Sequence, residues 1–140
     1  MSEVEVKQIR ATGGCLCGSV RYIVRGELRN VVACHCVFCR RLHSHFAAYA
    51  ACDKADLELI SVGKLRWYRS SPTTHRGFCS RCGAQMFSEN RDEGDISIAA
   101  GTFNEPTGLT LIEHICVAQK GSYYEITDGL PQKRGGADCN

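Results

Sequence analysis

The chain has 140 residues, of which 44% are hydrophobic and 23% are charged. These values are typical of a single globular domain with a core of its own. Seventeen basic and fifteen acidic residues leave a formal net charge of +2, with both signs scattered along the sequence. This balance argues against a basic surface that binds nucleic acid.

No segment has the features of a membrane span or of a secretion signal. The longest apolar run, residues 46–52, is far shorter than the ~18 residues that a bilayer requires. The first ten residues contain Glu3, Glu5 and Lys7 and lack the apolar stretch of a signal peptide. We therefore expect a cytoplasmic protein. In that reducing compartment, clustered cysteines more often bind metals or act as catalytic thiols than form disulfides.

The pattern of apolar residues predicts short β-strands separated by turns. Val20, Tyr22 and Val24 alternate with polar residues and predict the first strand. Further strands are predicted at 31–34, 45–52, 57–60, 65–69, 73–78, 84–88, 95–100 and 111–118, with Gly, Pro, Asn and Asp in the turns between them. A helical turn is expected only at 37–42. The sequence thus predicts an all-β sandwich or barrel of short antiparallel strands, with a single domain over 1–133 and a flexible tail over 134–140.

Seven of the ten cysteines fall into tight clusters that indicate zinc. The clusters are Cys15 with Cys17, Cys34 with Cys36 and Cys39, and Cys79 with Cys82. Two pairs supply four thiolates, which is enough to close one tetrahedral structural zinc site. Gly18 and Gly83 next to these pairs suit a backbone that wraps tightly around a metal ion.

The trio of Cys34, Cys36 and Cys39 supplies three thiolates and leaves a fourth position open on a second zinc ion. A thiol is the ligand that best suits this open position, because zinc binds sulfur and would ionise a thiol whose free pKa is about 8.5. Such a site can activate the thiol for carbon–sulfur bond chemistry. Two alternatives remain open at this point. His35 or a further cysteine completes a second closed site, or the trio is a redox cluster without a metal.

Other polar residues near the clusters are weaker candidates. His43 and His45 follow the trio, although a hydrogen-bonded or surface role is more usual for such histidines. Four arginines lie beside the clusters and could bind a carboxylate, although a solvated face is the more ordinary role: Arg40, Arg41, Arg76 and Arg81.

Several motifs together carry a family resemblance. They are GGCLCG at 13–18, CHCVFCR at 34–40, YRSS at 68–71, FCSRCG at 78–83, and the stretch 114–131 with His114, Lys120, Tyr124, Asp128 and Pro131. In this order they resemble the glutathione-dependent formaldehyde-activating enzymes, the family that shares its domain with centromere protein V. The resemblance implies a Mss4-like all-β fold, a structural zinc on Cys15, Cys17, Cys79 and Cys82, and a catalytic zinc on Cys34, Cys36 and Cys39. The activity it implies is the condensation of glutathione with formaldehyde to S-(hydroxymethyl)glutathione, which is classed with the carbon–sulfur lyases.

We therefore expect a zinc-dependent enzyme that adds a small thiol, such as glutathione, reversibly to a small aldehyde. A solvent proton or a nearby histidine would protonate the product oxygen. Only scattered arginines are available for the carboxylates of a tripeptide, so we expect weak glutathione binding and a smaller or different thiol as the partner. The alternative is a non-catalytic zinc-stabilised module that binds a protein. A methionine sulfoxide reductase fits poorly, because those enzymes hold zinc on two CxxC pairs and the first pair here is CxC.

Overall fold

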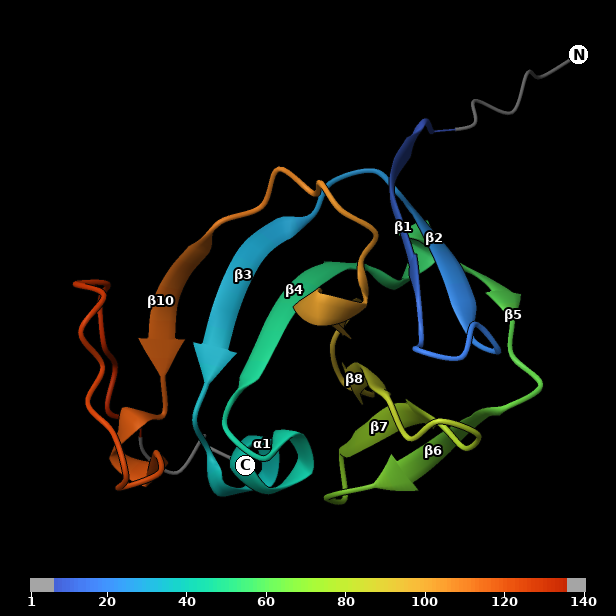
Figure 1. The fold of residues 1–140 in the computed structure, drawn as a ribbon. Coiled ribbons are helices and arrows are strands. Elements are labelled where there is room, and N and C mark those ends of the chain that lie inside the picture. The colour runs from blue at the N-terminus through green and yellow to red at the C-terminus, as the bar shows by residue number, and fades with distance from the viewer. Residues whose placement is uncertain (1–6, 136–140) are drawn as a thin grey trace, which may run out of the picture.

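The computed structural model describes residues 7–135, and this part of the chain is folded mainly into β-strands. The all-β class expected from the sequence is confirmed. Two sheets make up the fold (Figure 1). The smaller has the order β1-β2-β5, with β1 at Ile9–Gly14, β2 at Arg21–Arg25 and β5 at Leu57–Ser61.

The larger sheet has seven strands in the order β10-β3-β4-β9-β8-β7-β6. Their bounds are β3 Arg29–Cys34, β4 Ala47–Asp53, β6 Leu65–Arg69, β7 Thr74–Cys79, β8 Gln85–Asn90, β9 Asp95–Ala99 and β10 Leu111–Ile115. Each predicted strand is present, with ends shifted by a few residues. β1 was not predicted, because its sequence has no apolar alternation and its first residues are exposed.

One pairing differs from the antiparallel arrangement that we expected. β10 runs parallel to β3, with His114 opposite Ala33 and Ile115 opposite Cys34. The chain reaches β10 from the end of β9 through the long connection 100–110, so β10 starts at the same end of the sheet as β3. As a result, Ile115 lies beside Cys34, the first cysteine of the trio, and His114 lies one position before it along β10.

Helical segments are short and occupy the connections. α1 (Val37–His43) joins β3 to β4, as the sequence predicted, and it begins where the Cys36 sulfur accepts a hydrogen bond from the Cys39 N–H at 3.4 Å. The 3-10 turns are η1 Lys54–Asp56, η2 Ala100–Thr102 and η3 Val117–Gln119. In the described residues, no helix is long and apolar enough to cross a membrane.

The main core lies between the two sheets. The alternating residues Val20, Tyr22 and Val24 are buried against Phe87 and Ile98 of the larger sheet. The ring of Tyr22 meets that of Phe87 edge-on, with 5.5 Å between centroids. Removing such side chains from water contributes roughly 1.5–3 kcal/mol each, so this contact fixes one sheet on the other.

The chain folds back after β10. The N–H of His114 donates to the carbonyl of Pro131, and the N–H of Ala118 donates to the carbonyl of Arg134. Residues 136–140, which make up most of the expected tail, lie outside the described residues.

Candidate metal centres and cavity

The two cysteine pairs meet in one cluster at the junction of the sheets. Cys15 and Cys17 lie in the turn between β1 and β2. Cys79 is the last residue of β7, and Cys82 lies in the turn that follows. The four sulfur atoms are all within 4.8 Å of one another and could hold a metal ion. Cys15 and Cys17 are 3.7 Å apart at sulfur, and Cys17 and Cys79 are 3.8 Å apart.

The two turns bend in the same way around their sulfur atoms. The N–H of Val20 donates to the Cys15 sulfur at 3.2 Å, and the N–H of Cys82 donates to the Cys79 sulfur at 3.4 Å. Gly18 and Gly83 have φ values of 80° and 82°, a left-handed conformation that side chains other than glycine rarely adopt. Backbone N–H groups, that of Ala84 above all, lower the pKa of Cys82 to about 6, which favours the thiolate that a metal requires.

The trio forms a second cluster where β3 ends and α1 begins. The sulfur atoms of Cys34, Cys36 and Cys39 lie within 4.8 Å of one another and could also hold a metal ion. Cys36 and Cys39 are buried, whereas Cys34 is partly exposed. Hydrogen bonds from the thiols of Cys34 and Cys39, helped by the N–H of Cys39, lower the pKa of Cys36. Cys36 is therefore the first of the three to ionise.

His35, which stands between two of these cysteines, has both ring nitrogens occupied by other groups. Its Nε2 lies 2.9 Å from His114 Nδ1, and its Nδ1 lies 3.2 Å from the Tyr124 hydroxyl. His114 Nε2 in turn lies 2.7 Å from the Asp128 carboxylate. This contact lowers the pKa of Asp128 and keeps the carboxylate ionised.

The carboxylate fixes the direction of one of these hydrogen bonds, because it can only accept: His114 donates to Asp128 through Nε2. When His114 Nδ1 carries no proton, it accepts from His35 Nε2, and His35 Nδ1 accepts from the Tyr124 hydroxyl. Burial, together with His114, lowers the pKa of His35 to about 4, so His35 is neutral near pH 7. The arrangement makes His35 a member of a buried hydrogen-bonded chain, and neither of its nitrogens is directed at the trio.

Replacement of His114 tests the structural importance of this chain. His114→Leu leaves Nε2 of fully buried His35 without its hydrogen-bond partner, and we expect it to lower the free energy of unfolding by about 1–3 kcal/mol. His75→Leu is the matched control, because the His75 side chain is 39% exposed and contacts Glu89 on the sheet surface. Urea unfolding of both variants measures the difference. Equal losses would contradict a special role for the buried chain.

A cavity of about 280 Å³ extends from the trio along one face of the larger sheet. Its wall consists of alternate residues on neighbouring strands: Val32 and Cys34 on β3, Tyr49 on β4, Ser97 on β9, Ser88 and Asn90 on β8, and Thr74 and Arg76 on β7. Alternate strand residues point to the same face, which explains how five strands contribute to one wall. Small polar side chains occupy positions that a buried sheet face would fill with apolar ones.

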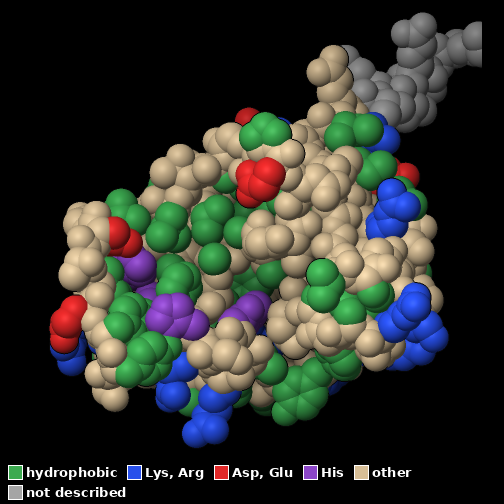
Figure 2. Space-filling view, viewed as in Figure 1, with side chains coloured by type: hydrophobic (Ala, Val, Ile, Leu, Met, Phe, Trp, Pro, Cys, Tyr) green, Lys and Arg blue, Asp and Glu red, His purple; other side chains and the backbone are tan. Residues whose placement is uncertain are grey.

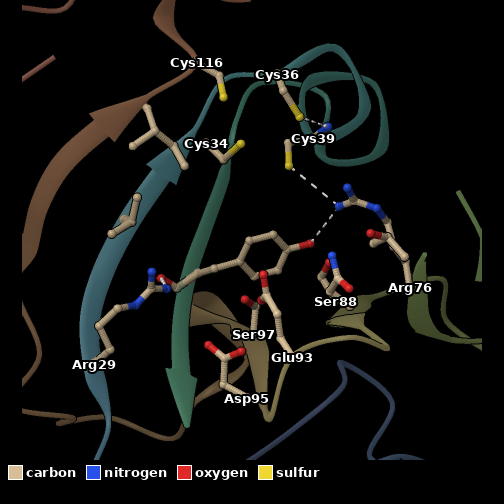
Figure 3. A pocket seen from close by; sticks show the side chains of 15 residues that line it. Arg29, Cys34, Cys36, Cys39, Arg76, Ser88, Glu93, Asp95, Ser97 and Cys116 are labelled. Atoms are coloured by element: carbon tan, nitrogen blue, oxygen red, sulfur yellow. Dashed lines mark hydrogen bonds between the residues drawn. The ribbon is translucent and has the colours of Figure 1, made fainter. Parts of the chain in front are cut away.

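The two ends of the cavity differ in chemistry. Figure 3 shows the cysteine sulfur atoms and Arg76 at one end and Arg29, Glu93 and Asp95 at the other. The cavity thus offers sulfur ligands at one end and groups of both charges at the other, a combination suited to a small polar molecule with a thiol. Figure 2 shows histidine side chains gathered among apolar ones on the lower left of the molecule, near the ends of β3 and β10.

Tyr49 is a functional candidate that the sequence did not single out, and Arg76 is one for which a solvated role was the more ordinary expectation. Arg76 is only 4% exposed, and its guanidinium donates to the Cys39 sulfur at 3.6 Å, the Tyr49 hydroxyl at 3.4 Å and the Ser70 hydroxyl at 3.1 Å. None of the ion pairs found within residues 7–135 involves Arg76. A buried cation needs an opposite charge, and thiolates of the trio are the charge within reach.

Electrostatics agree with this pairing. Burial alone would lower the pKa of Arg76, but the facing sulfur of Cys39 and the phenol of Tyr49 outweigh it, so that the pKa is raised. We had expected a solvated role for the arginines near the clusters, and for Arg76 that was wrong. The sequence signal was weak, because an arginine in an alternating strand usually faces solvent.

The remaining candidates make hydrogen bonds to groups other than the cysteine sulfur atoms. His43 Nε2 bonds to the Tyr49 hydroxyl at 2.9 Å, and His45 contacts the hydroxyl of Tyr123. Arg40 donates to the carbonyl of Gln119 at 3.1 Å, and Arg81 donates to Ser19 at 3.4 Å. The hydrogen-bonded role expected for His43 and His45 is confirmed.

Comparison with known proteins agrees with the motifs. A crystal structure of a structural-genomics target protein from Rhodobacter sphaeroides superimposes with a TM-score of 0.59 and 25% sequence identity, over 69% of this chain and 91% of that one. The sequence profile of the glutathione-dependent formaldehyde-activating enzymes matches residues 10–119. The match includes both cysteine clusters and extends to the end of η3, the last element of the fold. The chain therefore belongs to the family of glutathione-dependent formaldehyde-activating enzymes.

Proposed function

We propose that this protein is a zinc-dependent enzyme that adds a thiol, such as glutathione, reversibly to a small aldehyde, such as formaldehyde. Its reaction would be of the S-(hydroxymethyl)glutathione synthase type, among the carbon–sulfur lyases. The observation that carries the proposal is the position of the trio of Cys34, Cys36 and Cys39 at one end of a polar cavity. The clustered free thiols suit a reducing compartment, and we propose the cytoplasm as its location.

Zinc fits the sulfur geometry of the closed cluster. Four sulfur atoms about 2.3 Å from a tetrahedral zinc ion lie roughly 3.8 Å from one another. The distances of 3.7 Å and 3.8 Å in the cluster of Cys15, Cys17, Cys79 and Cys82 match this value. We propose that these four residues hold a structural zinc.

The trio offers three thiols and a partly exposed face toward the cavity, which suits a zinc ion with one exchangeable position. A zinc ion bound there would hold the incoming thiol as a thiolate at neutral pH. Arg76 supplies a positive charge beside the trio, which stabilises the thiolates that such a site requires. His35 is committed to His114 and Tyr124, so the alternative in which it closes the site has no support in the geometry.

The far end of the cavity favours a thiol that also carries charged groups. Arg29 can bind a carboxylate, while Glu93 and Asp95 can bind an ammonium group. The sequence suggested only scattered arginines, but Arg29 and Arg76 line the same cavity. We therefore propose a zwitterionic thiol of the glutathione type as the partner, rather than a simple alkyl thiol, and this proposal replaces the weak glutathione binding expected from the sequence.

Calorimetric titration tests this assignment. The zinc-loaded protein is titrated with glutathione, cysteine and ethanethiol, and its zinc content is measured by atomic emission. We expect two zinc ions per chain, thiol-dependent heat, and weaker binding of ethanethiol because it lacks the charged groups that the far end can bind. Exchange between ¹³C-formaldehyde and S-(hydroxymethyl)glutathione, followed by NMR, should be faster with the protein than without it. A single inert zinc and no thiol binding would instead favour a zinc-stabilised protein-binding module.

A further inference from the structure

The Tyr49 hydroxyl lies at the cysteine end of the cavity between two polar side chains. Its oxygen is 2.9 Å from His43 Nε2 and 3.4 Å from Arg76 Nη1. Tyr49 is 7% exposed, yet it lines the cavity together with the trio. The residue therefore faces the place where a thiol-bound substrate would sit.

Hydrogen-bond accounting identifies the tautomer of His43 that leaves the phenolic proton of Tyr49 for the cavity. A guanidinium has only donors, so the phenol oxygen accepts from Arg76. Burial, followed by the charge of Arg76, lowers the pKa of His43 to about 4, so this histidine is neutral near pH 7. When its proton is on Nε2, His43 also donates to the phenol. The oxygen then has both lone pairs in use, and its own proton remains for a group in the cavity.

The location of this donor suits the proposed chemistry. Arg76 Nη1 bonds both to the Tyr49 hydroxyl and to the Cys39 sulfur. The Tyr49 oxygen and the Cys39 sulfur therefore lie within two hydrogen-bond lengths of each other. Burial raises the pKa of Tyr49, which keeps the phenol protonated and able to donate at neutral pH. A buried donor placed beside a developing negative charge contributes far more than one in water.

We propose that Tyr49 is a catalytic residue whose hydroxyl donates a hydrogen bond to the aldehyde oxygen, with Arg76 and His43 as the residues that position it. This inference rests on the proposed thiol addition. As the sulfur lone pair forms the carbon–sulfur bond, the π electrons of the carbonyl move to its oxygen, which gains negative charge next to Tyr49. A proton from solvent completes the new hydroxyl and balances the proton that the thiol released.

Tyr49→Phe removes the hydroxyl and keeps the ring, and it is the first test. Arg76 keeps its contacts with the Cys39 sulfur and the Ser70 hydroxyl in this variant. Loss of one such donor should lower kcat by roughly 100-fold, while zinc content and the affinity for the thiol stay unchanged. Tyr22→Phe is the matched control, because Tyr22 is equally buried and its hydroxyl bonds to Thr102, away from the cavity. This control should keep the wild-type kcat. A wild-type kcat in Tyr49→Phe would overturn the inference, as would a loss that comes entirely from lost zinc or lost thiol affinity.

A binding measurement tests the donor without turnover. Formate presents a carboxylate oxygen in place of the aldehyde oxygen, which gains negative charge during the addition. Protein labelled with [ζ-¹³C]tyrosine reports on each phenol by NMR. Formate should shift the Tyr49 signal, identified by its absence in Tyr49→Phe, and leave the Tyr22 signal in place. An unshifted Tyr49 signal overturns the inference whether or not the wild-type protein is active. A shifted signal in a protein that catalyses no addition would support the donor site and reject the proposed reaction.

Discussion

Cys82→Ser is expected to leave an insoluble or molten chain rather than a folded, inactive one. Its cluster joins the β1–β2 turn to the β7–β8 turn, and Cys17 and Cys79 are 62 positions apart in the sequence. A crosslink of that span restricts the unfolded chain by about 4 kcal/mol in the chain-entropy description. Structural zinc contributes roughly 10–16 kcal/mol of apparent binding free energy, comparable with the ~5–15 kcal/mol stability of a whole domain. Loss of one zinc ligand therefore removes most of the free energy of unfolding.

Thermal unfolding followed by circular dichroism, with zinc analysis of the soluble fraction, measures this effect. Cys52→Ser is the matched control, since Cys52 is a buried cysteine of the same core outside both clusters. That variant should remain folded with a lower Tm, because it loses packing but no metal ligand. Cooperative unfolding at the wild-type Tm and a normal zinc content in Cys82→Ser would rule out the structural assignment.

Cys36→Ser is expected to fold, to lose about one zinc per chain and to lose binding of thiols. The Cys36 sulfur caps α1 by accepting from the Cys39 N–H. Serine is among the best residues at that position, so the helix should persist. The serine hydroxyl is a poor replacement for a thiolate ligand, so we expect the metal site to lose its zinc.

The result is read from zinc content and calorimetry with glutathione, beside Cys52→Ser as the same substitution outside the clusters. The far-ultraviolet circular dichroism spectrum should match that of the wild type. Two zinc ions retained in Cys36→Ser, or only one in the metal-replete wild type, would remove the basis for an open site.

Much of the fold was predictable because its strands alternate and its turns contain typical turn residues. The alternation of Val20, Tyr22 and Val24 became a buried strand face. β1 escaped prediction because it lies at a sheet edge and its pairing with β2, rather than any apolar pattern, makes it a strand. The parallel pairing of β10 with β3 depends on where a long connection leads the chain, which no local pattern encodes.

The cysteine clusters were predictable for a different reason, since cysteines that are close in sequence are brought together by a single tight turn of the backbone. The cavity was not, because each strand contributes only one or two small polar residues such as Ser88 and Ser97. In sequence, these look like positions on a solvated face. Tyr49 lies in an apolar stretch of sequence that resembles a core strand. Only the structure shows that its hydroxyl accepts a hydrogen bond from Arg76 of β7.

The trio and most of the cavity wall come from different parts of the chain, which has a consequence for divergence within the family. All three sulfur atoms come from the six residues 34–39, whereas most of the wall comes from β4, β7, β8 and β9. A substitution at Ser88 or Ser97 alters the shape and polarity of the wall without touching a metal ligand. Relatives with the same cysteine trio can therefore evolve different substrates by changing single strand residues. The cysteine motif alone is a poor guide to which thiol or aldehyde a given member uses.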